Sequence, residues 1–165
     1  MARLPHTIRP ATAADEAFLW TMLYHAIHVP PGEPPPPRNI VDRPELSHIV
    51  AGWMTREGDA GVITEVGGQP VGAAWMRLPQ EDMHGYGYVD DRTPELSIAL
   101  LPDYRGAGLG TALLTHLIEQ ARTAHPALSL SVSETNRAKQ LYERLGFVPL
   151  YRDAGGSWTM LLRFE

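Results

Sequence analysis

A glycine-rich turn in the second half of the chain carries the clearest chemical signal. Its six residues are, in order, Arg105, Gly106, Ala107, Gly108, Leu109 and Gly110. A strand pattern precedes the turn and a helix pattern follows it, so glycines without a Cβ would let backbone amides meet the oxygens of an anion. The positive end of the following helix dipole adds attraction for negative charge. The turn therefore predicts a site for a pyrophosphate group.

Two widespread phosphate-binding motifs do not describe this turn. A Rossmann fingerprint requires three spaced glycines after the first strand and an acidic residue about twenty positions further on. A P-loop requires Gly-Lys followed by Ser or Thr. The sequence contains neither pattern here, and the turn lies late in the chain.

Around this turn the chain resembles the GNAT superfamily of N-acetyltransferases. The central family signature is Arg or Gln, two residues, Gly, any residue, and then Gly or Ala, which Arg105, Gly108 and Gly110 match. A second segment, residues 136–147, looks like the later helix of the family and its Leu-Tyr-x-x-x-Gly-Phe ending. The two segments also have the order and separation of the family. The specific motifs cover residues 95–148, and the order of the elements extends the resemblance over the chain.

The resemblance implies acetyl-CoA as co-substrate, with no metal ion, and assigns roles to particular residues. The end of the fourth strand would offer backbone groups to the pantetheine arm, and one amide there would polarise the thioester carbonyl; these residues are Ala99, Leu100 and Leu101. Residues 105–110 would hold the pyrophosphate and Asn136 would contact the pantetheine. Tyr142 would protonate the departing thiolate, because a phenol with a pKa of about 10 is a proton donor at neutral pH.

One spacing departs from the family pattern. Asn136 and Tyr142 lie six positions apart, one fewer than the commonest family spacing. Thr135 consequently stands at the position where the family usually has its asparagine.

An amine must lose a proton before or during attack on a thioester, so a base or a water chain is expected beside the fourth strand. Glu95 opens that strand and is the first candidate; it could act through a water molecule. Glu134, just after the fifth strand, is the second. For both residues the alternative is a solvated carboxylate at a strand edge.

The elements that must position these residues follow from periodicity and turn signals. Strands are expected at residues 6–9, 60–66, 70–78, 95–101, 127–133, 147–151 and 157–164, and helices at residues 12–26, 42–53, 109–121 and 135–145. The first two helices open with capping-box candidates, Thr12 with Asp15 and Asp42 with Glu45. The expected fold is α/β, with a mixed, mostly antiparallel central sheet of about seven strands and about four flanking helices. The resemblance implies the same fold.

Two long segments are expected to be loops. Residues 30–37 contain six prolines, which fix φ and lack an amide hydrogen, so they predict a stiff, extended loop. If the resemblance holds, this loop forms a lid or wall of the acceptor site, with a partner-binding segment as the alternative. Tyr86 and Tyr88, in the loop at residues 79–94, either line the same pocket or only cover the sheet edge.

Length and composition limit the classes of protein and of function that fit the chain. The chain has 165 residues with 44% hydrophobic content, which suits one globular domain over residues 1–165. The net charge of −5 gives no indication of a nucleic-acid surface. The absence of cysteine excludes a thiol nucleophile, and His25 with His28 lacks a third metal ligand at a recognisable spacing. Without a signal-peptide pattern or a long apolar run, no membrane association and a cytoplasmic location are expected.

The predicted activity is transfer of an acetyl group to a primary amine by direct attack in a ternary complex. The acceptor would be a small-molecule or peptide amine, and the resemblance leaves room for a homodimer. Three alternatives stay open at this point. The chain could bind acetyl-CoA as a sensor or scaffold without turnover, use another acyl-CoA, or acylate an oxygen acceptor.

Overall fold

The computed structural model describes residues 4–165, which form one seven-stranded sheet in the order β1-β2-β3-β4-β5-β7-β6. The strands are β1 (Thr7–Pro10), β2 (Ala60–Val66), β3 (Gln69–Arg77), β4 (Glu95–Leu100), β5 (Ala127–Ser133), β6 (Val148–Arg152) and β7 (Ser157–Arg163). Neighbouring strands are antiparallel except β4 and β5, which are parallel. The prediction of a mixed, mostly antiparallel sheet is confirmed.

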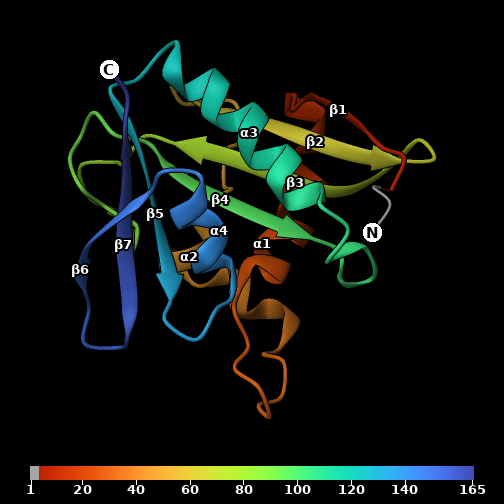
Figure 1. Ribbon diagram of the computed structural model, residues 1–165, viewed down its shortest axis with the longest axis horizontal. Helices are drawn as coiled ribbons and strands as arrows, with labels where there is room; N and C mark the ends of the chain where they lie inside the picture. The colour runs from red at the N-terminus through yellow and green to blue at the C-terminus, as the bar shows by residue number, and fades with distance from the viewer. Residues whose placement is uncertain (1–3) are drawn as a thin grey trace.

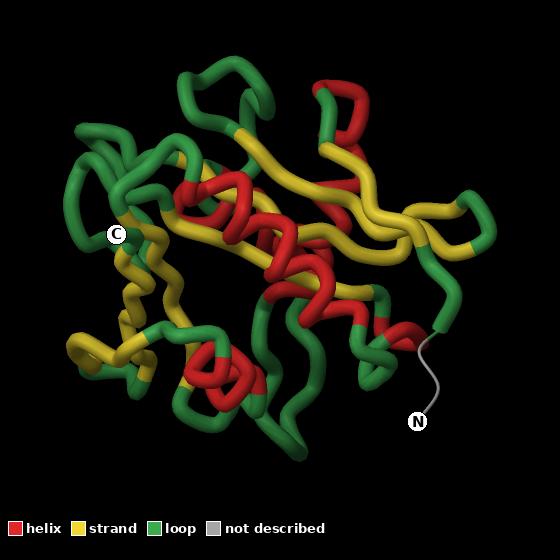
Figure 2. Tube along the Cα trace, turned by 45° about the horizontal axis from the view of Figure 1, so that its top comes forward, coloured by secondary structure: helices red, strands yellow, loops and turns green. Residues whose placement is uncertain are grey.

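Helices cover both faces of this sheet. Within residues 4–165 the α-helices are α1 (Glu16–Ala26), α2 (Pro44–Ser47), α3 (Leu109–Arg122) and α4 (Ala138–Arg144). Alternate residues of β3 separate the two faces: Ala74 and Met76 pack in the core with α3, whereas Ala73 and Trp75 pack in the core with α1. Figure 2 shows α3 lying across one face of the strands. None of the described helices is long and apolar enough to cross a membrane.

The sheet opens between its two parallel strands. β4 and β5 are joined by a single residue pair, Glu95 with Ser129, where β4 begins. Figure 1 shows the two strands diverging from that point, so that the far end of β4 has no strand beside it on that edge. The opening therefore leaves part of a central strand available to a ligand.

The capping box of Thr12 and Asp15 is confirmed, although it opens a 3-10 turn at Ala13–Asp15 before α1 begins. The predicted helix at residues 42–53 is wrong, because α2 has only four residues and its N-cap is Arg43. Pro44 favours an extended backbone at the residue before it, which stops a helix from starting at Asp42. Gly52 and Met54, both with a φ of 67°, end any continuation. Helix α4 also begins three residues later than predicted.

A buried ion pair holds the segment for which the longer helix was predicted. Arg77, 6% exposed, donates to both carboxylate oxygens of Asp59, 1% exposed, at 2.9 and 3.0 Å. The same guanidinium donates to the carbonyls of His48, Ala51 and Gly52 at 2.8–3.0 Å. All five of its donor hydrogens are therefore used, and the turns after α2 are held to β3 by one side chain.

Replacing Arg77 with Met is expected to lower the free energy of unfolding by about 3–5 kcal/mol, because Asp59 would stay buried without its partner. Urea unfolding followed by circular dichroism measures the change. Arg152→Met is the control, since Arg152 pairs with Glu134 at the surface and such pairs contribute about 0–1 kcal/mol. Equal losses in the two variants would contradict a central role for the buried pair.

Candidate active site

The backbone of β4 divides into two sets of polar groups. Leu101 donates to the Val71 carbonyl at 2.8 Å, and the register pairs Ala99 with Ala73. Because backbone groups alternate sides along a strand, those of Ala99 and Leu101 are directed at β3, and those of Ile98 and Leu100 at the opening. The carbonyl of Leu101 also accepts from Tyr104 at 2.9 Å. The prediction that Leu101 offers backbone groups to a ligand is therefore wrong. The backbone N–H and C=O of Ala99 also point toward β3 and away from the opening.

A cleft of about 1440 Å³ fills the opening between β4 and β5. It brings together most of the predicted site residues, which come from four different segments of the chain. Those in its wall are Glu95, Ala99, Leu100, Arg105, Gly106, Gly108, Gly110, Asn136 and Tyr142. Leu101, Ala107 and Leu109 do not line it; the side chain of Leu109 is fully buried in the core beneath the turn.

The glycine turn presents bare backbone to this cleft. Gly106 and Gly108 have φ angles of 77° and 82°, in a region that side chains other than glycine rarely adopt. A Cβ built on either residue would meet nothing within 4 Å, so the space above the turn is open. Helix α3 starts at Leu109, and the first amides of a helix have no partner within it. The turn can therefore surround an anion with amide donors.

Arg105 links the turn to two neighbouring elements. Its Nε donates to the carbonyl of Leu100 at 3.4 Å and its guanidinium to the carbonyl of His25 at 3.2 Å. The side chain thus ties the end of β4 to the end of α1, and it lines the cleft from that position.

Tyr142 projects from α4 into the cleft from the side of β5. It is 7% exposed, and its ring packs edge-on against Phe147 with centroids 6.0 Å apart. Burial raises the pKa of Tyr142 to about 12. The phenol is therefore a neutral proton donor throughout the physiological pH range.

Asn136 and not Thr135 faces the cleft. Asn136 lies in the turn before α4, where its Oδ1 accepts from the amide of Ala138 at 2.9 Å. Thr135 is exposed and its hydroxyl lies 2.8 Å from Nε2 of His28. The short spacing to Tyr142 thus leaves an amide side chain in the wall of the cleft.

Glu95 lies in the cleft at the point where β4 and β5 are still paired. Burial raises the pKa of its carboxyl to about 7, and the amide of Gly87, donating at 3.1 Å, lowers it in part. A carboxyl with a pKa near neutrality can accept a proton and release it again at physiological pH. The alternative interpretation of Glu95, a solvated carboxylate at a strand edge, therefore does not describe its position.

Of the other candidates, Glu134 lies outside the cleft, whereas His25, His28 and Tyr86 line it. Glu134 is exposed and pairs with Arg152 at the surface, outside the cleft. His25 and His28 line the cleft, but among residues 4–165 no three His, Asp or Glu side chains gather as a metal site requires. Tyr86 lines the cleft, and Pro30, Pro35 and Pro36 of the stiff loop form another part of its wall.

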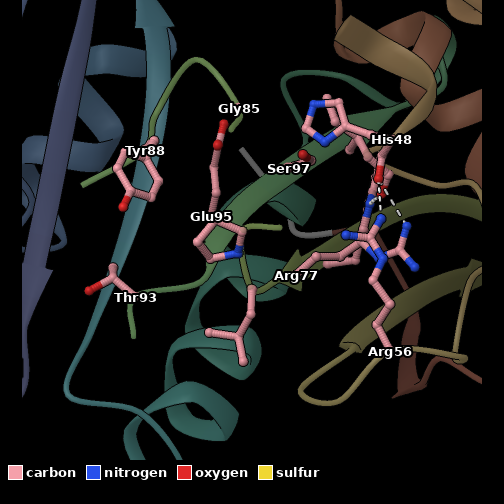
Figure 3. Close-up of a pocket in the computed structure, with 12 residues that line it drawn as sticks. His48, Arg56, Arg77, Gly85, Tyr88, Thr93, Glu95 and Ser97 are labelled. Atoms are coloured by element: carbon pink, nitrogen blue, oxygen red, sulfur yellow. Dashed lines mark hydrogen bonds between the residues drawn. The ribbon is translucent and has the colours of Figure 1, made fainter. Parts of the chain in front are cut away.

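Two groups at the site have no signal in the sequence. Ile98 contributes backbone groups to the opening, which depends on the strand register and not on residue type. His48 follows α2 and lies in a small cavity beside Glu95, as Figure 3 shows. Only a correct helix boundary at residues 44–47 would have placed it there.

Comparisons with known proteins agree with this geometry. Residues 20–147 match the family model described as the acetyltransferase (GNAT) family. A [ribosomal protein bS18]-alanine N-acetyltransferase of Haemophilus influenzae is 43% identical over 58 residues, which span 34% of this chain and 40% of that relative. A glucosamine 6-phosphate N-acetyltransferase of Trypanosoma brucei brucei is 28% identical over 118 residues, 66% of this chain and 76% of the relative.

The fold also resembles solved structures over nearly its whole length. A putative acetyltransferase from Salmonella typhimurium, solved with its cofactor acetyl-CoA, superposes with a TM-score of 0.71 at 22% sequence identity. The superposition covers 98% of this chain and 95% of that chain. At this identity the likeness concerns the fold.

Proposed function

Because the chain belongs to the acetyltransferase (GNAT) family and is therefore an acyltransferase, we propose that it transfers the acetyl group of acetyl-CoA to a primary amine. The amine attacks the thioester directly in a ternary complex, without an acyl-enzyme. The observation that carries the proposal is the single cleft that gathers the glycine turn, the open edge of β4, Glu95 and Tyr142. Each group suits one requirement of the reaction.

The residues divide this work among themselves. The amides of residues 106–110 bind the pyrophosphate, helped by the dipole of α3. Backbone amides of Ile98 and Leu100 stabilise the negative charge that develops on the thioester oxygen. Asn136 binds the pantetheine arm. Acetyl-CoA supplies the activated acetyl group, and the rest of the chemistry is proton transfer.

Two protons must move for each acetyl group transferred. Glu95, through a water molecule, takes a proton from the ammonium of the acceptor so that the nitrogen lone pair can attack. Tyr142 gives a proton to the sulfur as the carbon–sulfur bond breaks. The nitrogen of the tetrahedral adduct loses its second proton in the same step, and this proton returns Tyr142 to its neutral form. The products are the N-acetyl amine and CoA with its thiol restored.

The nature of the acceptor rests on the relatives and on the cleft. One relative is named for an alanine of a ribosomal protein and another for an amino sugar phosphate. The match spans only 40% of the first relative, so the proposal extends to a small-molecule or peptide amine and no further. We place the protein in the cytoplasm, as one domain over residues 1–165, and a homodimer is the assembly that the resemblance suggests.

The proposed function is tested by release of CoA from acetyl-CoA in the presence of a panel of primary amines. The panel includes amino acids, polyamines, amino sugars and peptides, with matched alcohols and tertiary amines as controls. We expect at least one primary amine to accelerate release and to be recovered as its N-acetyl derivative by mass spectrometry. Binding of acetyl-CoA without transfer to any amine would favour a sensor, and transfer only to alcohols would favour an oxygen acceptor.

The pH dependence of kcat/KM should report the ionisation of Glu95. A base must be ionised to act, so the rate is expected to fall about tenfold per pH unit below the pKa of about 7. In Glu95→Gln the rate at pH 8 should drop by about 10²-fold, and this acidic limb should disappear. A Glu95→Gln profile that keeps both the rate and the limb of the wild type would remove Glu95 as the base.

A further inference from the structure

A second, smaller cavity lies beside the cleft and shares Glu95 and Ser97 with it. The cavity has a volume of about 30 Å³ and is closed on its other side by His48, Arg56 and Arg77. Figure 3 shows the Ser97 hydroxyl close to the His48 ring, and the Glu95 carboxylate on the Gly85 side of the cavity that all three line. We name it the His48 cavity.

His48 brings a buried, unpaired nitrogen to this cavity. Its Nε2 is buried and has no hydrogen-bond partner among the described residues. The backbone of Glu45 raises the pKa of the ring, against the larger lowering effects of burial and of Arg56. An imidazole that donates from Nδ1 presents the Nε2 lone pair as an acceptor. That acceptor requires a donor.

The His48 cavity is large enough to hold a water molecule, which can be the hydrogen-bond donor to Nε2. A water molecule needs roughly 10–15 Å³ of such space and two to four polar partners. A water in the cavity would donate one hydrogen to Nε2 of His48 and the other to the carboxylate of Glu95, and would accept from the hydroxyl of Ser97. Leaving a buried acceptor unpaired costs about 1–3 kcal/mol, which favours occupation of the site.

We propose that His48 is a further proton carrier of the site, joined to Glu95 through a water molecule in the His48 cavity, and that it passes the amine proton to solvent. This inference rests on the proposed function. Glu95 first takes the proton and becomes a neutral carboxylic acid. The acid then gives it to the water, which gives another to Nε2, so that the carboxylate is restored. Because Nε2 is buried and the side chain as a whole is only half-buried, the imidazolium releases its other proton, from Nδ1, to solvent. A turn of the ring then presents an unprotonated nitrogen to the cavity again.

The charges around His48 favour that release. Burial lowers the pKa of His48, and the positive charge of Arg56 lowers it further, with a smaller effect of Arg77. Arg77 is neutralised by Asp59, whereas the guanidinium of Arg56 donates to the carbonyl of His48. Glu95 is the one carboxylate among the residues that line the cavity with His48. His48 therefore holds the proton only briefly.

The link itself can be tested without turnover. The ¹⁵N signals of the His48 ring should follow two ionisations in the wild type, one of them that of Glu95 near pH 7. In Glu95→Gln that inflection should vanish, whereas Glu134→Gln, which alters an exposed carboxylate, should leave the curve unchanged. Identical His48 curves in the wild type and Glu95→Gln would overturn the proposal, even if the protein is an active acetyltransferase.

Kinetics of His48→Gln then test the transfer of the proton. We expect kcat to fall about tenfold, with KM for acetyl-CoA changed less than about twofold, because the relay and not binding is removed. Added imidazole should restore part of the rate after subtraction of a reaction without protein. His116→Gln, an exposed histidine on α3, is the control. A variant with the wild-type kcat, or a loss of kcat that imidazole does not restore, would overturn the role of His48.

Discussion

Replacing Tyr142 with Phe is expected to lower kcat by about 10²-fold or more, because general acid catalysis contributes about 10²–10⁴-fold to such reactions. The substitution removes only the hydroxyl, and the ring keeps its packing against Phe147. The thiolate would then have to leave without a proton. Steady-state kinetics at saturating acetyl-CoA measure the loss, with KM for acetyl-CoA expected to stay near its wild-type value.

Tyr104→Phe is the matched control for this variant. Tyr104 lies just before the glycine turn but does not line the cleft, so loss of its hydroxyl should leave kcat unchanged. A Tyr142→Phe enzyme that turns over like the wild type would show that another group, or water, protonates the sulfur.

Replacing Gly108 with Trp is expected to raise KM for acetyl-CoA by about 100-fold or more. The indole would occupy the open space above the turn, where amides would otherwise bind the pyrophosphate. Loss of two hydrogen bonds to a charged group, each contributing about 1.5–3 kcal/mol, corresponds to at least that factor. The rise in melting temperature on addition of CoA should be lost in parallel.

Gly68→Trp separates this effect from backbone strain. Gly68 has a φ of 79°, close to that of Gly108, and it also has nothing within 4 Å of its Cβ position. It lies in the turn between β2 and β3, outside the cleft. The two variants should lose similar stability, and only Gly108→Trp should lose affinity. Equal affinities for acetyl-CoA would mean that the pyrophosphate binds elsewhere.

Local patterns predicted the parts of the site that depend on local structure. The bounds of β5 follow from alternating apolar and hydroxyl residues and those of β2 from the Gly67-Gly68 hairpin turn, and both agree with the predicted ranges. The turn at residues 105–110 lies between a strand and a helix because its glycines tolerate positive φ there. Tyr142 is the buried residue of α4, on the side of the helix where apolar residues repeat at the helical period.

The parts that depend on distant contacts could not be predicted. Whether the backbone of Leu100 or of Leu101 faces the cleft depends on register with β3, which residue types do not specify. In the segment where a helix was expected, residues 42–53, three backbone carbonyls accept hydrogen bonds from Arg77, a residue 25 or more positions away. His48 lies in the turns that follow the short helix α2, and there it lines the cavity beside Glu95.

Calorimetric titration of the wild-type protein with acetyl-CoA tests the central claim most directly. The claim is that the cleft between β4 and β5, with its glycine turn, is an acetyl-CoA site. It predicts saturable binding of acetyl-CoA and of CoA at one site per chain, with both affinities lowered by about 100-fold or more in Gly108→Trp and retained in Gly68→Trp. Absence of binding by the wild type would contradict the account, because every catalytic role proposed for the cleft depends on that co-substrate.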